Sequence, residues 1–308
     1  MPPPQGSFNP IEGPGDYTFT KDVHNDTYPA IDPAKANHSG HAVFISGASK
    51  GVGRAIAISF AKAGASYIAV GARSGLSEVS EAIKKAAKDS GRSEPSVLAL
   101  KLDVTDRKSV EDAAARIEKE FGKLDVAINN AGVLGGTTLI ADSDPDVWWN
   151  TFTVNLRGPY LVSRSCIPLL LKGDLKTLIT VTSVGAHSIL PTFSDYMPSK
   201  LAVTRLMEFA TAEYRDQGLV AYSVHPGNIL TDIIEGLCMG EGMDEKFKAV
   251  FTETLELCGD SLVYLTDEKR EWLGGRYINC TWDLPELTSS PKKDEIIKEN
   301  KLKVKLSI

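Results

Sequence analysis

Apolar residues between positions 41 and 282 alternate between short runs and longer stretches with helical spacing. The runs are rich in Val and Ile without polar alternation, which is typical of strands buried on both faces. The stretches between them repeat apolar residues every three or four positions, as at Val52, Ile56 and Phe60. This alternation predicts an α/β fold with a single Rossmann-type, doubly wound parallel sheet and helices on both faces. About seven strands are expected, at 42–46, 67–71, 97–102, 124–129, 177–182, 220–224 and 276–279.

The pattern divides the chain into three segments. At about 150 residues per domain, 308 residues suggest two domains, but one continuous sheet accounts for residues 41–282. Residues 1–40 hold seven of the 16 prolines and show no periodicity, which predicts an extended arm. Aromatic residues such as Tyr17 and Phe19 allow this arm to lie on the body or on a neighbouring subunit, and the alternative is an unattached tail. Residues 283–308 are expected to form a C-terminal tail.

The composition disfavours several classes of function. Asp and Glu total 40 against 34 Lys and Arg, and this net charge of -6 argues against a nucleic-acid partner. The sequence contains no apolar run long enough to span a membrane. Its four cysteines form no C-x-x-C pair, so neither a metal site nor a disulfide framework is expected. Without a signal sequence at its start, the chain is expected to be cytoplasmic.

A glycine-rich turn follows the first predicted strand. Gly47, Gly51 and Gly53 permit positive φ and close backbone approach to a pyrophosphate at the positive end of the next helix. The alternative is a plain glycine-rich turn, but a strand before and a helix after favour a dinucleotide site. The predicted cofactor-binding residues of this turn are Gly47, Ser49, Lys50, Gly51 and Val52.

The second strand indicates which dinucleotide is bound. An NAD site places an acid about 20 residues past the glycines, whereas a 2'-phosphate needs Arg. No acid occurs between Ser66 and Ser77, and Arg73 and Ser74 stand where that acid would be. Arg73 or Lys50 alone is typical of a solvated surface charge, but the two together favour NADP(H) over NAD.

Two further strand ends add candidate cofactor contacts. Asp103 and Val104 follow the third strand, where a carboxylate can accept a hydrogen bond from an adenine amino group. Asn130, Ala131 and Gly132 follow the fourth strand, on the same edge of the sheet. As alternatives, Asp103 suits a helix N-cap and Asn130 suits a turn.

The candidate catalytic residues follow the fifth strand. Tyr196 and Lys200 are four residues apart, so on a helix they share one face, and Ser183 ends the preceding strand. Pro198 is tolerated only in a first turn, so Asp195 or Ser194 is the expected N-cap. A lysine cation about 4 Å from the phenol would stabilise the phenolate by roughly 4 kcal/mol, which predicts a pKa for Tyr196 near 7. Ser183 would hold a substrate oxygen, although a strand-end serine also commonly caps a turn.

Together these motifs resemble the one-domain branch of the short-chain dehydrogenase/reductase superfamily, over residues 41–282. The resemblance implies an NADP-binding catalytic domain in which Tyr196 is the general acid/base, Ser183 orients the carbonyl, and Lys200 binds the nicotinamide ribose and lowers the tyrosine pKa. It also implies that Asn155 holds a proton-relay water, and that homodimers or homotetramers form through the helices flanking the fifth strand. Near the nicotinamide it implies contacts from Pro226, Gly227, Ile229 and Thr231.

Two features lie outside the core of this resemblance. Ser46 stands where the family usually has threonine, which keeps the hydroxyl. The arm and the tail are similar to those of fungal reductases of secondary metabolism.

Two segments are predicted to line the substrate site, one before Tyr196 and one after Thr231. Their apolar side chains predict a fairly apolar ketone or secondary alcohol as substrate. The glycines of the second segment suit a lid, and an ordinary amphipathic helix is the alternative. The predicted lining residues are Gly185, His187, Leu190, Phe193, Ile233, Leu237 and Met239.

Three functions fit these residues. The first is an NADP(H)-dependent oxidoreductase that interconverts a ketone and an alcohol. The second is a dehydratase or isomerase of the same fold, with Tyr196 as a base and no net redox change. The third is a non-catalytic NADPH-binding protein, which would have no need of Tyr196 and Lys200.

Overall fold

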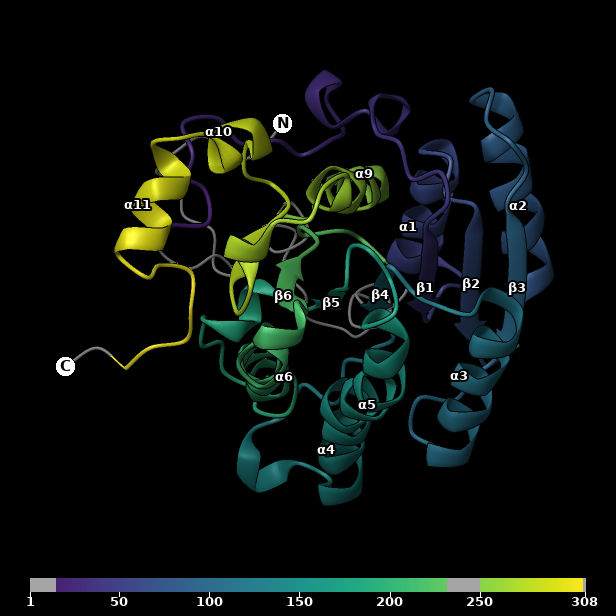
Figure 1. Ribbon diagram of the computed structural model, residues 1–308. Coiled ribbons are helices and arrows are strands. Elements are labelled where there is room, and N and C mark those ends of the chain that lie inside the picture. Colours follow the sequence, from purple (N-terminus) through teal and green to yellow (C-terminus); the bar gives the residue numbers. More distant parts are fainter. Residues whose placement is uncertain (1–14, 232–249, 307–308) are drawn as a thin grey trace.

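The structure is a computed structural model that describes residues 15–231 and 250–306. Seven strands within these residues form one sheet of order β3-β2-β1-β4-β5-β6-β7, in which every neighbouring pair is parallel (Figure 1). The predicted α/β class and doubly wound sheet are therefore confirmed. The strands are β1 Ala42–Ser46, β2 Tyr67–Ala72, β3 Ser96–Lys101, β4 Val126–Asn129, β5 Thr177–Val181, β6 Val220–His225 and β7 Tyr277–Asn279.

Helices cover both faces of this sheet. One apolar cluster joins α1, α2 and α9 to the sheet, and a second joins α3, α5 and α6 to the opposite face (Figure 1). The helices described are α1 Gly51–Lys62, α2 Leu76–Asp89, α3 Arg107–Phe121, α4 Pro145–Phe152, α5 Gly158–Leu170, α6 Tyr196–Tyr214, α9 Leu255–Thr266, α10 Leu284–Thr288 and α11 Lys292–Lys298.

The central strand β1 shows how the sequence specifies this layering. Val43 and Ile45 belong to the cluster under α1, whereas Phe44 belongs to the cluster under α3. Alternate residues of a strand point to opposite faces, so a strand covered on both sides is apolar throughout. The edge strand β3 differs, because several of its side chains are half-buried or exposed.

The strand order sets the position of the site. The chain proceeds from β1 outward through β2 to β3 and then returns to β4 on the other side of β1. Ligands of such sheets bind at this switch point, outside the carboxyl ends of the strands. Ser46 and Asn129 end β1 and β4, and they therefore flank the expected crevice.

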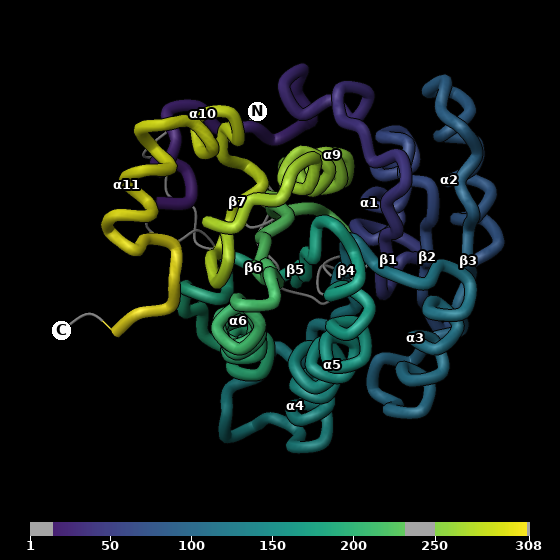
Figure 2. Tube along the Cα trace, viewed as in Figure 1, coloured from purple at the N-terminus to yellow at the C-terminus, as the bar shows by residue number. Residues whose placement is uncertain are grey.

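The described part of the arm lies on the body of its own chain, one of the arrangements that the sequence allows. Residue Val23 forms an antiparallel bridge with Trp282, and Ile31 is buried in the core. Figure 2 shows the purple described part of the arm beside the yellow C-terminal helices α10 and α11. The tail also contacts the sheet edge, because the Tyr277 N–H donates to the carbonyl of Leu302.

Candidate active site

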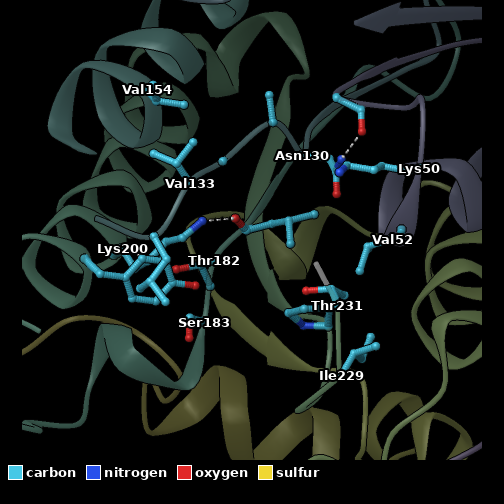
Figure 3. A pocket seen from close by; sticks show the side chains of 18 of the residues that line it. Lys50, Val52, Asn130, Val133, Val154, Thr182, Ser183, Lys200, Ile229 and Thr231 are labelled. Carbon is cyan, nitrogen blue, oxygen red and sulfur yellow. Dashed lines mark hydrogen bonds between the residues drawn. The ribbon is translucent and has the colours of Figure 1, made fainter. Parts of the chain in front are cut away.

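A cavity of about 870 Å³ lies at the carboxyl ends of the strands. In Figure 3 Lys50 and Val52 lie on one side of it, and Ser183 and Lys200 lie on the other. The structure places every predicted cofactor-binding residue on its wall: Gly47, Ser49, Lys50, Gly51, Val52, Arg73, Ser74, Asp103, Val104, Asn130, Ala131, Gly132, Tyr196, Lys200, Pro226, Gly227, Ile229 and Thr231.

The glycine turn opens the N-terminus of α1 to this cavity. Gly47 has φ 66°, and a Cβ atom there would lie 2.7 Å from the Cα of Ala131, so no larger residue fits. Gly51, the first residue of α1, has φ 56°, and a Cβ atom there would meet no other atom within 4 Å. The positive end of the helix is thus accessible to an anion.

Asn130 connects the β4 end to the glycine turn. Its side-chain amide donates to the carbonyls of Ser46 at 3.0 Å and Gly47 at 2.9 Å. Its backbone N–H donates to the Ser46 hydroxyl at 3.1 Å, so the serine in the place of the usual threonine still supplies an acceptor. Asn130 therefore shapes the wall of the cavity by holding the two strand ends together.

Two exposed cations stand at one end of the cavity, Lys50 before α1 and Arg73 after β2. Asp103 lies nearby, and its pKa is lowered, chiefly by hydrogen bonds from the hydroxyl and the N–H of Thr105 and to a smaller extent by Arg73. The carboxylate thus closes a turn while lining the cavity, whereas Asp106 is the residue that caps α3.

Ser183, Tyr196 and Lys200 meet at the other end. The N-cap of α6 is Asp195, as the sequence allowed, and its carboxylate accepts the Tyr196 N–H at 2.7 Å. Thr151 on α4 donates its hydroxyl to the same carboxylate at 2.8 Å, which fixes the start of the helix. Ser183 follows β5 and accepts the Gly185 N–H at 3.1 Å.

The electrostatics of Tyr196 differ from the sequence-based expectation. Burial raises the pKa of Tyr196, and the hydrogen bond with Ser183 only partly opposes this. Lys200 Nζ lies 5.5 Å from the centre of the tyrosine ring and donates to the carbonyl of Val181 at 3.1 Å. Burial also lowers the pKa of Lys200 to about 8. The predicted pKa near 7 for Tyr196 is therefore wrong for this arrangement, because the ammonium faces a backbone carbonyl and the ring.

Asn155 lies behind the cavity wall in a π-helical turn, Thr153–Arg157. Its side-chain carbonyl accepts the Val133 N–H at 2.9 Å, and its amide donates to the carbonyl of Val133 and to the Ser199 hydroxyl. These bonds tie the segment after β4 to α6. The proton-relay role of Asn155 stays a prediction.

The predicted substrate residues divide into three groups. Gly185, Leu190 and Phe193 line the cavity. Ile233, Leu237 and Met239 lie outside the described residues. His187 is not among the residues that border the described cavity, and its Nε2 atom lies 3.2 Å from the Asp16 carboxylate on the arm.

Comparisons with known proteins identify the family. The family model described as short chain dehydrogenase matches residues 41–240. The chain belongs to the short chain dehydrogenase family. Short chain dehydrogenase pigC of Monascus ruber is 56% identical over 305 residues, which are 99% of each chain. The predicted resemblance to the fungal branch is thus confirmed, and the protein is an oxidoreductase whose fold binds a nicotinamide cofactor.

Solved structures agree with this fold. A short chain dehydrogenase of Shigella flexneri in complex with NADP is 22% identical, with a TM-score of 0.68 over 79% of this chain and 97% of that one. Carveol dehydrogenase of Mycobacterium avium in complex with NAD is 20% identical, with a TM-score of 0.69 over 80% and 97%. At such identities the likeness shows the fold alone, so it leaves the choice between NADP and NAD to local residues.

The cavity of this dehydrogenase fits a dinucleotide. Its volume is within the usual range for ligand sites, and the open space at Gly51 leaves the α1 N-terminus accessible to a pyrophosphate. Across residues 15–231 and 250–306, no group of His, Cys, Asp or Glu side chains is arranged to hold a metal ion. The helices of the same ranges include none that is both long and apolar enough to cross a membrane.

Several wall residues were missed by the sequence reasoning. Val133 and Leu134 directly follow Gly132, so their proximity to a strand end was a usable signal. Asn150 and Val154 come from α4 and the π-helical turn, and nothing in the local sequence shows that these elements reach the cavity. Further wall residues that were not predicted include Val184, Met197, His225, Leu230 and Leu255.

A buried carboxyl group supports the part of the cavity wall formed by Gly227 and Asn228. Glu253 accepts the Asn228 N–H at 2.9 Å, and its side chain packs where a Cβ atom on Gly227 would stand. Burial raises the pKa of Glu253 to about 7, partly offset by hydrogen bonds from Thr252 and Asn228.

This carboxyl predicts a pH-dependent stability. Between its ordinary pKa of 4.5 and about 7 the unfolded chain loses this proton while the folded chain keeps it, so stability falls as pH rises. Glu253→Gln has no proton that titrates here. The free energy of unfolding of this variant, relative to that of the wild type, should therefore increase by at most about 3 kcal/mol across this window. Thermal melts at pH 4.5, 6 and 8 measure the difference. Glu256→Gln, at an exposed carboxyl, is the matched control. If the stability of this variant relative to the wild type rose with pH in the same way, the pH dependence could not be assigned to Glu253.

Proposed function

We propose that this dehydrogenase transfers a hydride between NADP(H) and a fairly apolar ketone or secondary alcohol, with Tyr196 as general acid/base. One observation carries the proposal. A single cavity has cations suited to a phosphate at one end and Ser183, Tyr196 and Lys200 at the other.

The preference for NADP(H) rests on Lys50 and Arg73. Both side chains are exposed where they border the cavity, and the stretch after β2 contains no acid that would bind a ribose 2'-hydroxyl. Arg can bind a phosphate through two parallel hydrogen bonds, and a lysine adds a second charge. Ser74 offers a further hydroxyl beside them. These groups favour the 2'-phosphate that distinguishes NADP from NAD.

The protein groups fit reduction of a carbonyl. The bound cofactor would supply the hydride. Ser183 would donate a hydrogen bond to the carbonyl oxygen, and Tyr196 would give that oxygen a proton as negative charge develops on it. The raised pKa of Tyr196 keeps the phenol protonated near neutral pH, which is the form that reduction requires. The Lys200 ammonium would stabilise the phenolate left after proton transfer.

Apolar side chains surround the substrate end of the cavity. Leu190 and Phe193 come from the segment before α6, Met197 from α6, and Val154 from the π-helical turn. Asn150 adds an amide and His225 an imidazole to the cavity wall. Such a surface favours an apolar carbonyl compound that carries few polar groups.

We also propose that the enzyme acts as a homodimer or homotetramer in the cytoplasm. The helices before and after β5 expose large apolar side chains, including Trp149 on α4, Tyr160 on α5 and Phe209 on α6. Such side chains on adjoining helices are typical of surfaces that associate.

Purified protein tests the function directly. Fluorescence titration with NADPH and NADH should show tighter binding of NADPH, and a panel of para-nitrobenzaldehyde, benzil, menadione and camphorquinone should oxidise bound NADPH, followed at its absorbance. Cofactor binding without turnover across a wider carbonyl panel would favour a non-catalytic binding protein. Conversion of a hydroxy-ketone without a change in cofactor absorbance would favour a dehydratase or isomerase.

A further inference from the structure

The N-terminal arm supplies a carboxylate to the back of the substrate site. Asp16 is buried, at 1% exposure, and its Oδ2 atom lies 3.2 Å from Nε2 of His187. His187 belongs to residues 183–193, here named the substrate loop. This loop begins at Ser183 and lines the cavity through Gly185, Leu190 and Phe193. An arm residue distant in sequence therefore contacts a loop that borders the cavity.

The position of Asp16 is fixed by the C-terminal end of the sheet. The indole N–H of Trp282 donates to the Asp16 carbonyl at 2.9 Å, and the Asn279 amide approaches its carboxylate at 3.5 Å. The ring of Phe19 packs on Trp282 at 4.7 Å, and the bridge between Val23 and Trp282 continues this docking. The carboxylate is thus presented to the substrate loop by a docked segment of the arm.

The substrate loop has a second anchor beside the first. His225, at the end of β6, accepts the Val184 N–H on Nδ1 at 3.2 Å, so the ring is held with its proton on Nε2. Burial lowers the pKa of His225 to about 4, Asp16 works in the opposite direction, and His187 adds to the lowering. These mutual effects, together with the contact between Asp16 and His187, indicate that Asp16, His187 and His225 lie close to one another.

The loop needs such anchors because little regular structure holds it. It contains one turn of 3-10 helix, Val184–Ala186, and then runs without a helix or strand to α6. The rings of His187 and Tyr277 lie 5.1 Å apart, and His187 also contacts Asp16; neither partner borders the described cavity. Movement of His187 would shift Gly185 and Leu190 on either side of it.

We propose that Asp16 is a positioning residue for substrate recognition, which through His187 fixes the substrate loop in the shape that receives the carbonyl compound. The proposal rests on the proposed function for the class of substrate, and Asp16 itself does not border the cavity in the described structure. It makes the N-terminal arm a part of the specificity apparatus of this dehydrogenase.

Asp16→Ala and Asp16→Asn test this role in the full-length protein with NADPH bound. Small displacements of positioning groups cost up to about 100-fold. We expect Asp16→Ala to raise KM for the best carbonyl of the panel about tenfold, with kcat and the Kd of NADPH changed less than about threefold. Asp16→Asn keeps the shape and loses the charge, so its effect should be intermediate, and Asp16→Glu should recover part of the loss.

Hydrogen exchange gives a readout that is independent of turnover. Amide exchange in residues 183–193 should rise in Asp16→Ala and in His187→Gln. The double variant should resemble either single variant, because the two side chains act as one contact. If no carbonyl of the panel is reduced, the proposed function fails, and exchange in the substrate loop still decides whether Asp16 fixes it.

Asp26→Asn is the matched control on the same arm. The Asp26 carboxylate accepts a hydrogen bond from Thr254 at 2.7 Å, so the variant loses the same charge at a docking contact that does not involve His187. It should leave both KM and loop exchange unchanged. Unchanged loop exchange in Asp16→Ala would overturn the proposal. The proposal would also be overturned if Asp26→Asn raised KM and loop exchange as much as Asp16→Ala does, because that result would indicate a general loosening of the arm.

Discussion

Tyr196→Phe should lower carbonyl reduction by roughly a thousandfold, because general acid catalysis by a positioned side chain contributes about 10²–10⁴-fold. The variant removes only the hydroxyl, and the ring can keep its place beside Lys200, whose Nζ lies 5.5 Å from the ring centre. The Kd of NADPH should therefore stay within about threefold of the wild-type value. Steady-state kinetics and fluorescence titration measure the two quantities.

Tyr264→Phe is the matched control for this change. Its hydroxyl lies 2.9 Å from that of Thr288, between α9 and α10, and Tyr264 does not line the described cavity. Turnover by this variant should equal that of the wild type. Substantial activity in Tyr196→Phe would show that another group delivers the proton. A parallel loss of NADPH affinity would show that the variant disturbs the cofactor site.

Arg73→Ala should weaken NADPH binding about tenfold and leave NADH binding almost unchanged. A hydrogen bond to a charged group is worth about 1.5–3 kcal/mol, and exposure of this side chain to water places the effect at the low end. NADH has no 2'-phosphate, so its affinity should not depend on this guanidinium. Parallel titrations with both cofactors give the ratio of the two Kd values, which cancels any general effect on the fold.

Arg116→Ala provides the control for net charge. Arg116 is an exposed residue of α3 that does not border the described cavity, and the variant changes the total charge by the same amount. Neither cofactor should bind it differently from the wild type. Equal losses of NADPH and NADH affinity in Arg73→Ala would refute the phosphate contact, and Lys50 would then be the remaining candidate.

These experiments separate the two ends of one cavity. Under the proposed function, Arg73 would discriminate between cofactors without contacting the reacting atoms, and Tyr196 would act on the substrate with little effect on cofactor binding. The Asp16 variants address a third property, the shape of the wall that receives the substrate. Each should change a different quantity: the ratio of two Kd values, kcat, or KM.

The sheet and its cofactor edge were predictable because both depend on local signals. A strand covered on both faces must be apolar throughout, as β1 is, and this pattern is readable in the sequence. Glycines such as Gly47 indicate a backbone conformation with positive φ, which other residues rarely adopt. Parallel strands place their carboxyl ends on one edge, so the predicted order of elements was sufficient to bring Asn130 and Gly47 together.

Three-dimensional packing determined the electrostatics of Tyr196 and the contacts of the side chains around the cavity. The pKa of Tyr196 depends on burial and on the group to which the Lys200 ammonium donates. That group is the carbonyl of Val181, which the sequence does not indicate. His187 was predicted to face the substrate, but the docked arm places Asp16 beside it. Asn150 reaches the cavity only through the packing of α4.

The sequence by itself thus determined the fold, the cofactor edge and the candidate catalytic residues, because buried periodicity and backbone requirements act over a few residues. Only the tertiary structure decided the protonation of Tyr196 and the contacts of the substrate loop. Both depend on burial and on side chains from distant segments, such as Asp16 and Val181, whose approach no local pattern records.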